Sequence, residues 1–146
     1  MKEVRNVLLV DDNPADVDLT KVALQENAHR SQIDCVGDGE EALAFLNRTG
    51  IHTEKPRPDL VILDLNLPKK DGRAVLAEVK SDPGLRGIPI VIFSTSRLNQ
   101  DIARSYELGA NCYVNKPGNL NDFLTAVQAI EEFWLGLTSL PQRGKS

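Results

Sequence analysis

The sequence predicts an α/β domain in which a five-stranded parallel sheet is covered by helices on both faces. Strand-like and helix-like segments alternate five times along the 146 residues. The run 60–63 is apolar at every position, which is typical of a parallel strand buried on both faces. Strands joined through helices make right-handed crossovers, and these crossovers place helices on both sides of a sheet.

Each expected element is bounded by residues that begin or end it. The expected strands are the short apolar runs 6–10, 33–36, 60–63, 89–93 and 112–114. Asn13-Pro14 predicts a helix start, because asparagine caps helices and proline fits the first helical turn. Gly109 predicts the end of the fourth helix. The last helix carries an apolar stripe formed by Phe123, Val127, Ile130 and Trp134.

Length and composition fit one ordinary globular domain. Hydrophobic residues make up 41% of the chain and charged residues 26%, and 146 residues can bury a substantial single core. We expect one domain over 1–146, with a core at about 6–134 and a tail at 135–146. The polar stretch 49–58, which contains two prolines and a glycine, predicts a long connection inside this domain.

Charge and hydropathy exclude several classes of partner. The net charge of −4 and the pI near 5.2 argue against a nucleic-acid surface, which needs a basic patch. No apolar run reaches the roughly 18 residues of a membrane span, and residues 1–6 lack an apolar signal segment. The chain is therefore expected in the cytoplasm. Cys35 and Cys112 are expected there as lone, buried, reduced thiols, and His29 and His52, in polar loops, as exposed side chains.

Four of the expected strands end at a charged or hydroxyl side chain. Asp11 and Asp12 follow the first strand, Asp64 the third, Ser94 the fourth, and Lys116 the fifth. Taken singly, these residues have plainer interpretations as a helix-capping acid pair, a solvated serine and a surface lysine. Together they indicate a site, because ligands of open parallel sheets bind at the carboxyl ends of the strands.

Acidic residues gathered at one edge of a sheet favour a divalent cation. Neighbouring carboxylates repel, which raises the cost of ionising all of them. Mg²⁺ relieves this cost, since it binds carboxylate and carbonyl oxygens and keeps several waters. The expected magnesium ligands are Asp12 and Asp64 directly, Asp11 through a water, and the backbone carbonyl of Asn66.

The same residues fit phosphoryl transfer to a carboxylate. Asp64 is ionised near pH 7 without a general base, so it can attack phosphorus and form an acyl phosphate. Such a transfer mainly needs positioning and charge neutralisation. Lys116 supplies a mobile positive charge for one phosphoryl oxygen, and the Ser94 hydroxyl can donate a hydrogen bond to another.

This combination of residues resembles a response-regulator receiver domain from Val7 to about Trp134. The matching features are the acid pair Asp11-Asp12, the phosphoacceptor position Asp64, the hydroxyl at Ser94, Lys116-Pro117, Pro68 and Asp71-Gly72. The resemblance implies a flavodoxin-like fold with strand order 2-1-3-4-5. It also implies that a histidine kinase phosphorylates Asp64, and that the chain is a signalling protein rather than an enzyme, although it assists its own phosphorylation and dephosphorylation.

The resemblance also implies a conformational switch and a cis peptide bond. Ser94 would move toward the phosphoryl group and Tyr113 would rotate into the vacated space, in a two-state equilibrium. Tyr113 can also be interpreted as a plain core aromatic. The Lys116-Pro117 peptide is expected to be cis, a form accessible mainly before proline. The chain departs from the commoner family pattern by carrying Ser94 where threonine is usual.

Three features resemble the small single-domain regulators that partner cyanobacterial and bacterial phytochromes. They are the connection 49–58, the run 64–73 and the ending Phe133-Trp134-Leu135. This resemblance implies a phytochrome kinase as partner and a homodimer formed through the last strand and helix. The expected dimer interface is the apolar tail, which would be unfavourable in water and includes Phe133, Trp134, Leu135 and Leu137.

Other functions are compatible with parts of the pattern. The kinase could be a non-photoreceptor kinase or a member of another phosphorelay. A phosphatase with an aspartate nucleophile resembles Asp-x-Asp, but Asn66 stands at the second position and cannot protonate a leaving group. A flavin mononucleotide site needs backbone N–H groups and hydroxyls after the first strand, whereas residues 11–16 are acidic.

Overall fold

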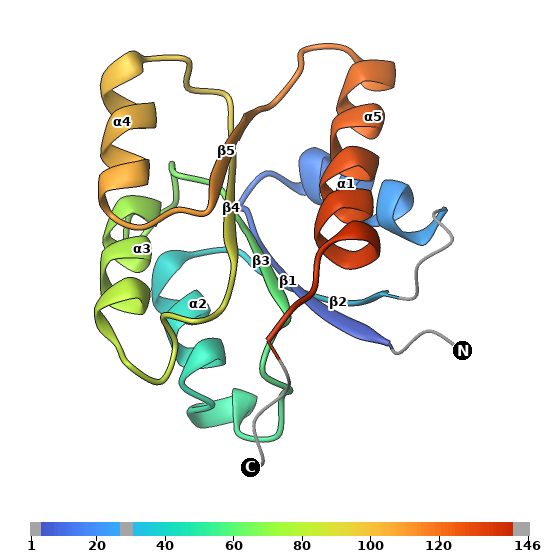
Figure 1. Cartoon of the computed structure of the whole chain (residues 1–146). Helices are drawn as coiled ribbons and strands as arrows, with labels where there is room; N and C mark the ends of the chain where they lie inside the picture. Colours follow the sequence, from blue (N-terminus) through green and yellow to red (C-terminus); the bar gives the residue numbers. More distant parts are fainter. Residues whose placement is uncertain (1–3, 27–30, 142–146) are drawn as a thin grey trace.

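The computed structural model describes residues 4–26 and 31–141 and confirms the predicted fold class. Five parallel strands form one sheet in the order β2-β1-β3-β4-β5, the order implied by the resemblance (Figure 1). The strands are β1 (Arg5–Val10), β2 (Ser31–Val36), β3 (Leu60–Leu63), β4 (Ile90–Ser94) and β5 (Cys112–Asn115).

A helix follows each strand. The helices are α1 (Pro14–Gln25), α2 (Gly39–Leu46), α3 (Gly72–Ser81), α4 (Asn99–Glu107) and α5 (Leu120–Glu131). A short 3₁₀ helix, η1 (Gly50–His52), lies inside the predicted long connection, and a π-helical segment, η2 (Glu132–Leu137), continues α5. Within the described ranges, no helix has both the length and the apolar character required to cross a bilayer.

The strands separate two apolar layers, because successive side chains of a strand point to opposite faces. Leu8, Val61 and Ile92 pack on one face against residues of α2 and α3. Val7 and Ile62 pack on the other face against residues of α1 and α5. Figure 1 shows α2, α3 and α4 on one side of the sheet and α1 with α5 on the other.

Side-chain caps fix where the helices begin, which places the loops above the sheet. Asn13 caps α1 by accepting from the Asp16 backbone N–H at 3.2 Å, and Pro14 follows at the first helical position, as predicted. Asp71 caps α3 by accepting from the Arg73 N–H at 2.8 Å. Capping of this kind stabilises a helix by about 1 kcal/mol.

Gly72 lets α3 approach the end of β3. Its N–H donates to the Leu65 carbonyl at 2.8 Å. A Cβ at this position would collide with the backbone carbonyl of Asp64 and would lie 2.7 Å from Leu65 Cα, closer than such atoms approach. A residue without a side chain is therefore required where α3 meets the loop that carries Asp64.

The predicted exposure of His52 is wrong. His52 was expected to be exposed, but it is only 7% exposed, because η1 folds back onto α2 and places its ring 5.2 Å from the Phe45 ring. His29 lies outside the described residues. Cys35 and Cys112 are free thiols, as predicted, but they are half-buried rather than buried. They lie on β2 and β5, the opposite edges of the sheet.

Candidate functional site

The strand register brings the predicted site residues to one edge of the sheet. Val10 of β1 is paired with Leu63 of β3, so the two following residues, Asp11 and Asp64, lie side by side. Ser94 ends β4 and is paired with Asn115 of β5, which places Lys116 directly beyond it. The four carboxyl ends predicted from sequence therefore converge.

Lys116 is the buried centre of the site. Its ammonium Nζ donates to Asp11 Oδ2 at 2.8 Å, Asp16 Oδ2 at 2.9 Å and Asp64 Oδ2 at 2.9 Å. The Lys116 side chain is 3% exposed, and Nζ lies 5.9 Å from the centre of the Phe93 ring, within reach of a cation–π interaction. One cation thus joins carboxylates from the carboxyl ends of β1 and β3 and from the first turn of α1.

Burial and charge act in opposite directions on this cluster. Burial alone would lower the pKa of Lys116, but its hydrogen bonds to Asp11 and Asp64 outweigh burial and raise the pKa above its usual value. Burial is the largest influence on Asp11 and raises its pKa, although Lys116 and the Asn13 N–H act to lower it. The ammonium is held firmly charged, while Asp11 is a carboxylate that is costly to keep ionised.

The donor set at this edge fits a divalent cation. Carboxylate oxygens of Asp11, Asp12 and Asp64 lie within 4.8 Å of one another, which is the separation of oxygens that share one ion. Asp11 is buried, Asp64 is half-buried and Asp12 is exposed, so waters can complete the coordination sphere, as Mg²⁺ requires. Asn66 is exposed beside this set, and its N–H lies 3.4 Å from Asp64 Oδ1.

The two predicted switch residues meet at Ser96. Ser94 is fully buried, and its Oγ accepts from the Ser96 N–H at 3.3 Å. The Tyr113 hydroxyl donates to the Ser96 carbonyl at 2.8 Å. Tyr113 is half-buried against the apolar layer below α2 and α3, so its ring lies inward in this structure. The Lys116 N–H donates to the Ser94 carbonyl at 2.8 Å, which ties the switch to the acid cluster.

The predicted cis bond before Pro117 is wrong for this structure. No cis peptide bond occurs among the described residues, which include Lys116 and Pro117. The trans form of such a bond is favoured by about 0.5–1 kcal/mol. With a trans bond, the Lys116 ammonium already reaches its three carboxylates, so a cis bond is not needed to place it.

Asp16 belongs to the site, although the sequence did not predict it as a site residue. Its carboxylate accepts from Lys116 at 2.9 Å. An acid in the first turn of a helix has an ordinary interpretation as a partner of the helix dipole. Its spacing could have indicated this role. Asp16 follows the cap Asn13 by three residues, so it lies in the first helical turn, and this turn stands at the edge of the sheet where the site is.

The predicted dimer residues divide into two pairs. Phe133 is 49% exposed and Leu137 is 74% exposed, so these two side chains present apolar surface to water. Trp134 and Leu135 are half-buried against the apolar layer of α1 and α5. The tail therefore completes the core with one pair and leaves the other pair on the surface.

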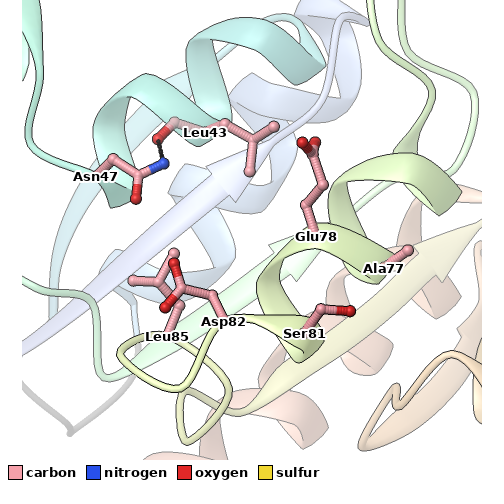
Figure 2. Close-up of a pocket in the computed structure, with 7 residues that line it drawn as sticks. All are labelled: Leu43, Asn47, Ala77, Glu78, Ser81, Asp82 and Leu85. Atoms are coloured by element: carbon pink, nitrogen blue, oxygen red, sulfur yellow. Dashed lines mark hydrogen bonds between the residues drawn. The ribbon is translucent and has the colours of Figure 1, made fainter.

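A separate groove of about 400 Å³ lies between α2 and α3 (Figure 2). Figure 2 shows that the side chains of Glu78, Ser81 and Asp82 come from or just after α3, opposite Leu43 and Asn47 of the α2 region. None of the residues that bind Lys116 lines this groove.

The fold and the site define a class of protein. The family model of the response regulator receiver domain matches residues 7–128, and the chain belongs to this family. It is a phosphoacceptor of two-component signalling.

The most informative relatives are regulators of the same size. The chain is 47% identical over 135 residues to response regulator Rcp1 of Synechocystis sp., covering 92% of each chain. It is 37% identical to the probable methanogenesis regulatory protein FilR2 of Methanothrix harundinacea, covering 92% of this chain and 86% of that one.

Solved structures support the same assignment. The phosphorylated cyanobacterial phytochrome response regulator RcpA superposes with a TM-score of 0.93 at 48% identity, covering 96% of this chain and 100% of that one. The Mn²⁺-bound form of Rcp1 superposes with a TM-score of 0.91 at 46% identity, covering 94% of this chain and 99% of that one.

Proposed function

We propose that Asp64 is the phosphoacceptor and takes its phosphoryl group from a phosphohistidine of a partner kinase. The observation that carries this proposal is the contact of Asp64 with Lys116 at 2.9 Å, beside two further carboxylates at the end of a buried strand. A carboxylate oxygen of Asp64 attacks phosphorus, the bond between phosphorus and the histidine nitrogen breaks, and the imidazole leaves.

The neighbouring side chains have distinct parts in this transfer. Lys116 neutralises charge on one phosphoryl oxygen, and its ammonium already stands at the reacting carboxylate. The Ser94 hydroxyl donates to a second oxygen. Ser94 and Tyr113 together then report the phosphorylated state by changing the face formed by α4, β5 and α5.

We propose Mg²⁺ as the resident cation, held directly by Asp12, Asp64 and the backbone carbonyl of Asn66, and by Asp11 through a water. The close carboxylate oxygens support a divalent ion, and a Mn²⁺-bound form of the relative Rcp1 is known. When bound, the ion supplies positive charge for the transferred group. Asp11, whose burial makes ionisation costly, and the exposed Asp12 complete the set of oxygens around it.

Asp64→Asn tests the phosphoacceptor. The variant should take up no phosphoryl group from acetyl phosphate with Mg²⁺, read on a phosphate-affinity gel, because an amide oxygen is a poor nucleophile. Asp18→Asn, which removes an exposed acid of α1, is the matched control and should label like the wild type. Full labelling of the Asp64→Asn protein would assign the acceptor to another residue.

The relatives support a phytochrome as the kinase. RcpA is a cyanobacterial phytochrome response regulator. AtBRR, which is 45% identical to this chain and superposes with a TM-score of 0.72, is a bacteriophytochrome response regulator. We propose that this chain acts in the cytoplasm as a binding partner, without nucleic-acid or membrane contact and without turnover of a substrate. Label transfer from candidate phytochrome kinases in both light states tests the pairing, and equal transfer from an unrelated kinase would contradict it.

We also propose a homodimer formed through β5, α5 and the tail. The exposed Phe133 and Leu137 support this arrangement, because neighbouring apolar side chains on a surface often mark an interface. Trp134 and Leu135 pack inward and hold the exposed pair in place.

A further inference from the structure

Ser96 contacts both switch residues through its backbone. Its N–H donates to Ser94 Oγ at 3.3 Å, and its carbonyl accepts from the Tyr113 hydroxyl at 2.8 Å. A serine hydroxyl has one hydrogen to donate and two acceptor positions. The Ser96 N–H uses an acceptor position of Ser94, so the hydroxyl hydrogen of Ser94 stays available for a phosphoryl oxygen.

The side chain of Ser96 is held in turn by α4 and α3. Its hydroxyl donates to Asp101 Oδ2 at 2.5 Å, in the first turn of α4. Asp101 Oδ1 is paired with Arg73 Nη2 of α3 at 2.9 Å. The Nη1 atom of Arg73 donates to both carboxylate oxygens of Asp71 at 3.1 Å. The chain of contacts thus runs from the Asp71 cap to the backbone of Ser96.

The charges in this chain of contacts support one another. The pKa of Asp101 lies below its usual value, chiefly because of the Ser96 hydrogen bond and then because of Arg73. Burial would lower the pKa of Arg73, but hydrogen bonds to Asp101 and Asp71 raise it. Arg73 is suited to this place because its planar guanidinium can bind two carboxylates at once, which a lysine ammonium does less well.

We propose that Arg73 is a positioning residue for the phosphoryl switch, acting through Asp101 and Ser96 on the Ser94 hydroxyl and the Tyr113 ring. The inference rests on the proposed roles of Ser94 and Tyr113. Arg73 follows the Asp71 cap and Gly72, which packs against the backbone of Asp64. The placement of α3 is therefore coupled to both ends of the switch, the acceptor loop and the loop after β4.

Two measurements on Arg73→Gln test this proposal. The chain contains two tyrosines, so ¹⁹F NMR of protein labelled with 3-fluorotyrosine gives two resonances, which Tyr106→Phe and Tyr113→Phe assign. The Tyr113 resonance should shift or broaden in Arg73→Gln. The affinity for beryllofluoride, a phosphoryl mimic, measured with Mg²⁺, should fall by about fivefold, the size of a typical coupling between sites.

Three controls separate positioning from a general loss of structure. Arg97→Gln removes the same charge from an exposed residue next to Ser96 and should leave both readouts unchanged. Arg73→Lys, which keeps the charge, should recover part of the affinity. Asp101→Asn should match Arg73→Gln, and the double variant should be no worse than either single variant, because all three break the same connection. Urea unfolding verifies that each variant is folded.

A failure of the positioning role of Arg73 can be distinguished from a failure of the proposed phosphoacceptor function. Failure of acetyl phosphate to label the wild type would overturn the phosphoacceptor assignment, whatever Arg73 does. Suppose instead that the wild type is labelled, and that Arg73→Gln alters neither the Tyr113 resonance nor the beryllofluoride affinity. This result would overturn the positioning role alone. Additive losses in Arg73→Gln and Asp101→Asn would do the same.

Discussion

Lys116 is a single ammonium shared by three carboxylates. Asp11, Asp16 and Asp64 each accept one of its hydrogen bonds, at 2.8–2.9 Å. Such an arrangement satisfies all three hydrogen-bond donors of the lysine. The three carboxylates, however, carry more negative charge than the one ammonium can neutralise. The site is therefore prepared for a further cation, and its stability should depend on the groups that neutralise it.

Lys116→Met should destabilise the protein most strongly when metal is removed. The substitution leaves Asp11 and Asp64 without their cation, which should lower the free energy of unfolding by about 3 kcal/mol in EDTA. Added Mg²⁺ should restore part of the loss, because it binds the same oxygens. Urea unfolding with EDTA and with Mg²⁺ measures both values.

The matched control for Lys116→Met is Lys21→Met, on α1, which removes a lysine that forms no ion pair within residues 4–26 and 31–141. Its unfolding free energy should change little in either buffer. An equal loss of stability for Lys116→Met with and without Mg²⁺ would show that the metal does not neutralise these carboxylates.

The pKa of Lys116 is raised above its usual value. The contribution of Lys116 to stability is therefore fully present at neutral pH, below the usual pKa of lysine, and is lost only as the pH rises through the raised pKa.

At the scale of single elements, the sequence predicts strands better than loops. The strand 60–63 was predicted with the bounds that the structure shows, because an unbroken apolar run ending at a carboxylate leaves few alternatives. The start of α1 at Asn13-Pro14 was also correct. In both places local composition and the fold require the same conformation.

The missed features depend on contacts between distant elements. His52 is buried because η1 packs on Phe45, and nothing in its polar neighbourhood indicates that contact. Asp16 joins the site only because Lys116, 100 residues later, reaches α1. The Ser94 to Tyr113 connection through Ser96 likewise requires the loop after β4 to be placed next to β5.

The start of α3 offers a test at this scale. Gly72→Ala should destabilise the domain by about 2 kcal/mol, because the added Cβ meets the backbone of Asp64 and Leu65. It should also slow phosphorylation by acetyl phosphate, since the acceptor loop has to shift. Gly37→Ala is the matched control, because a Cβ at Gly37 has no neighbour within 4 Å. Equal unfolding free energies for the two variants would contradict the close approach of α3.

At the scale of the whole molecule, the apolar tail predicts assembly. The double variant Phe133→Ser with Leu137→Ser should shift the mass measured by light scattering toward the 16.1 kDa of one chain. These residues are exposed, so the fold should be kept. Ile51→Ser is the matched control, because Ile51 is 89% exposed in the connection after α2. A mass unchanged by the double variant would remove the tail from the interface.

The fold also places the two thiols too far apart to form a disulfide within one molecule. Cys35 and Cys112 lie on β2 and β5, with three strands between them, a distance of about 19 Å at the usual strand spacing. A disulfide needs Cα atoms within about 7 Å, so the two cysteines of one molecule cannot close on each other. Burial raises the pKa of both thiols, which makes alkylation slow at neutral pH.

This separation supplies two chemical reporters without any engineering. Cys112 lies one residue before Tyr113, whereas Cys35 is at the far margin of the molecule. The alkylation rate of Cys112, followed by mass spectrometry, would therefore report the response of the receiver near Tyr113. The alkylation rate of Cys35 in the same sample would serve as the internal reference. Any covalent cross-link formed on oxidation would have to join two separate molecules.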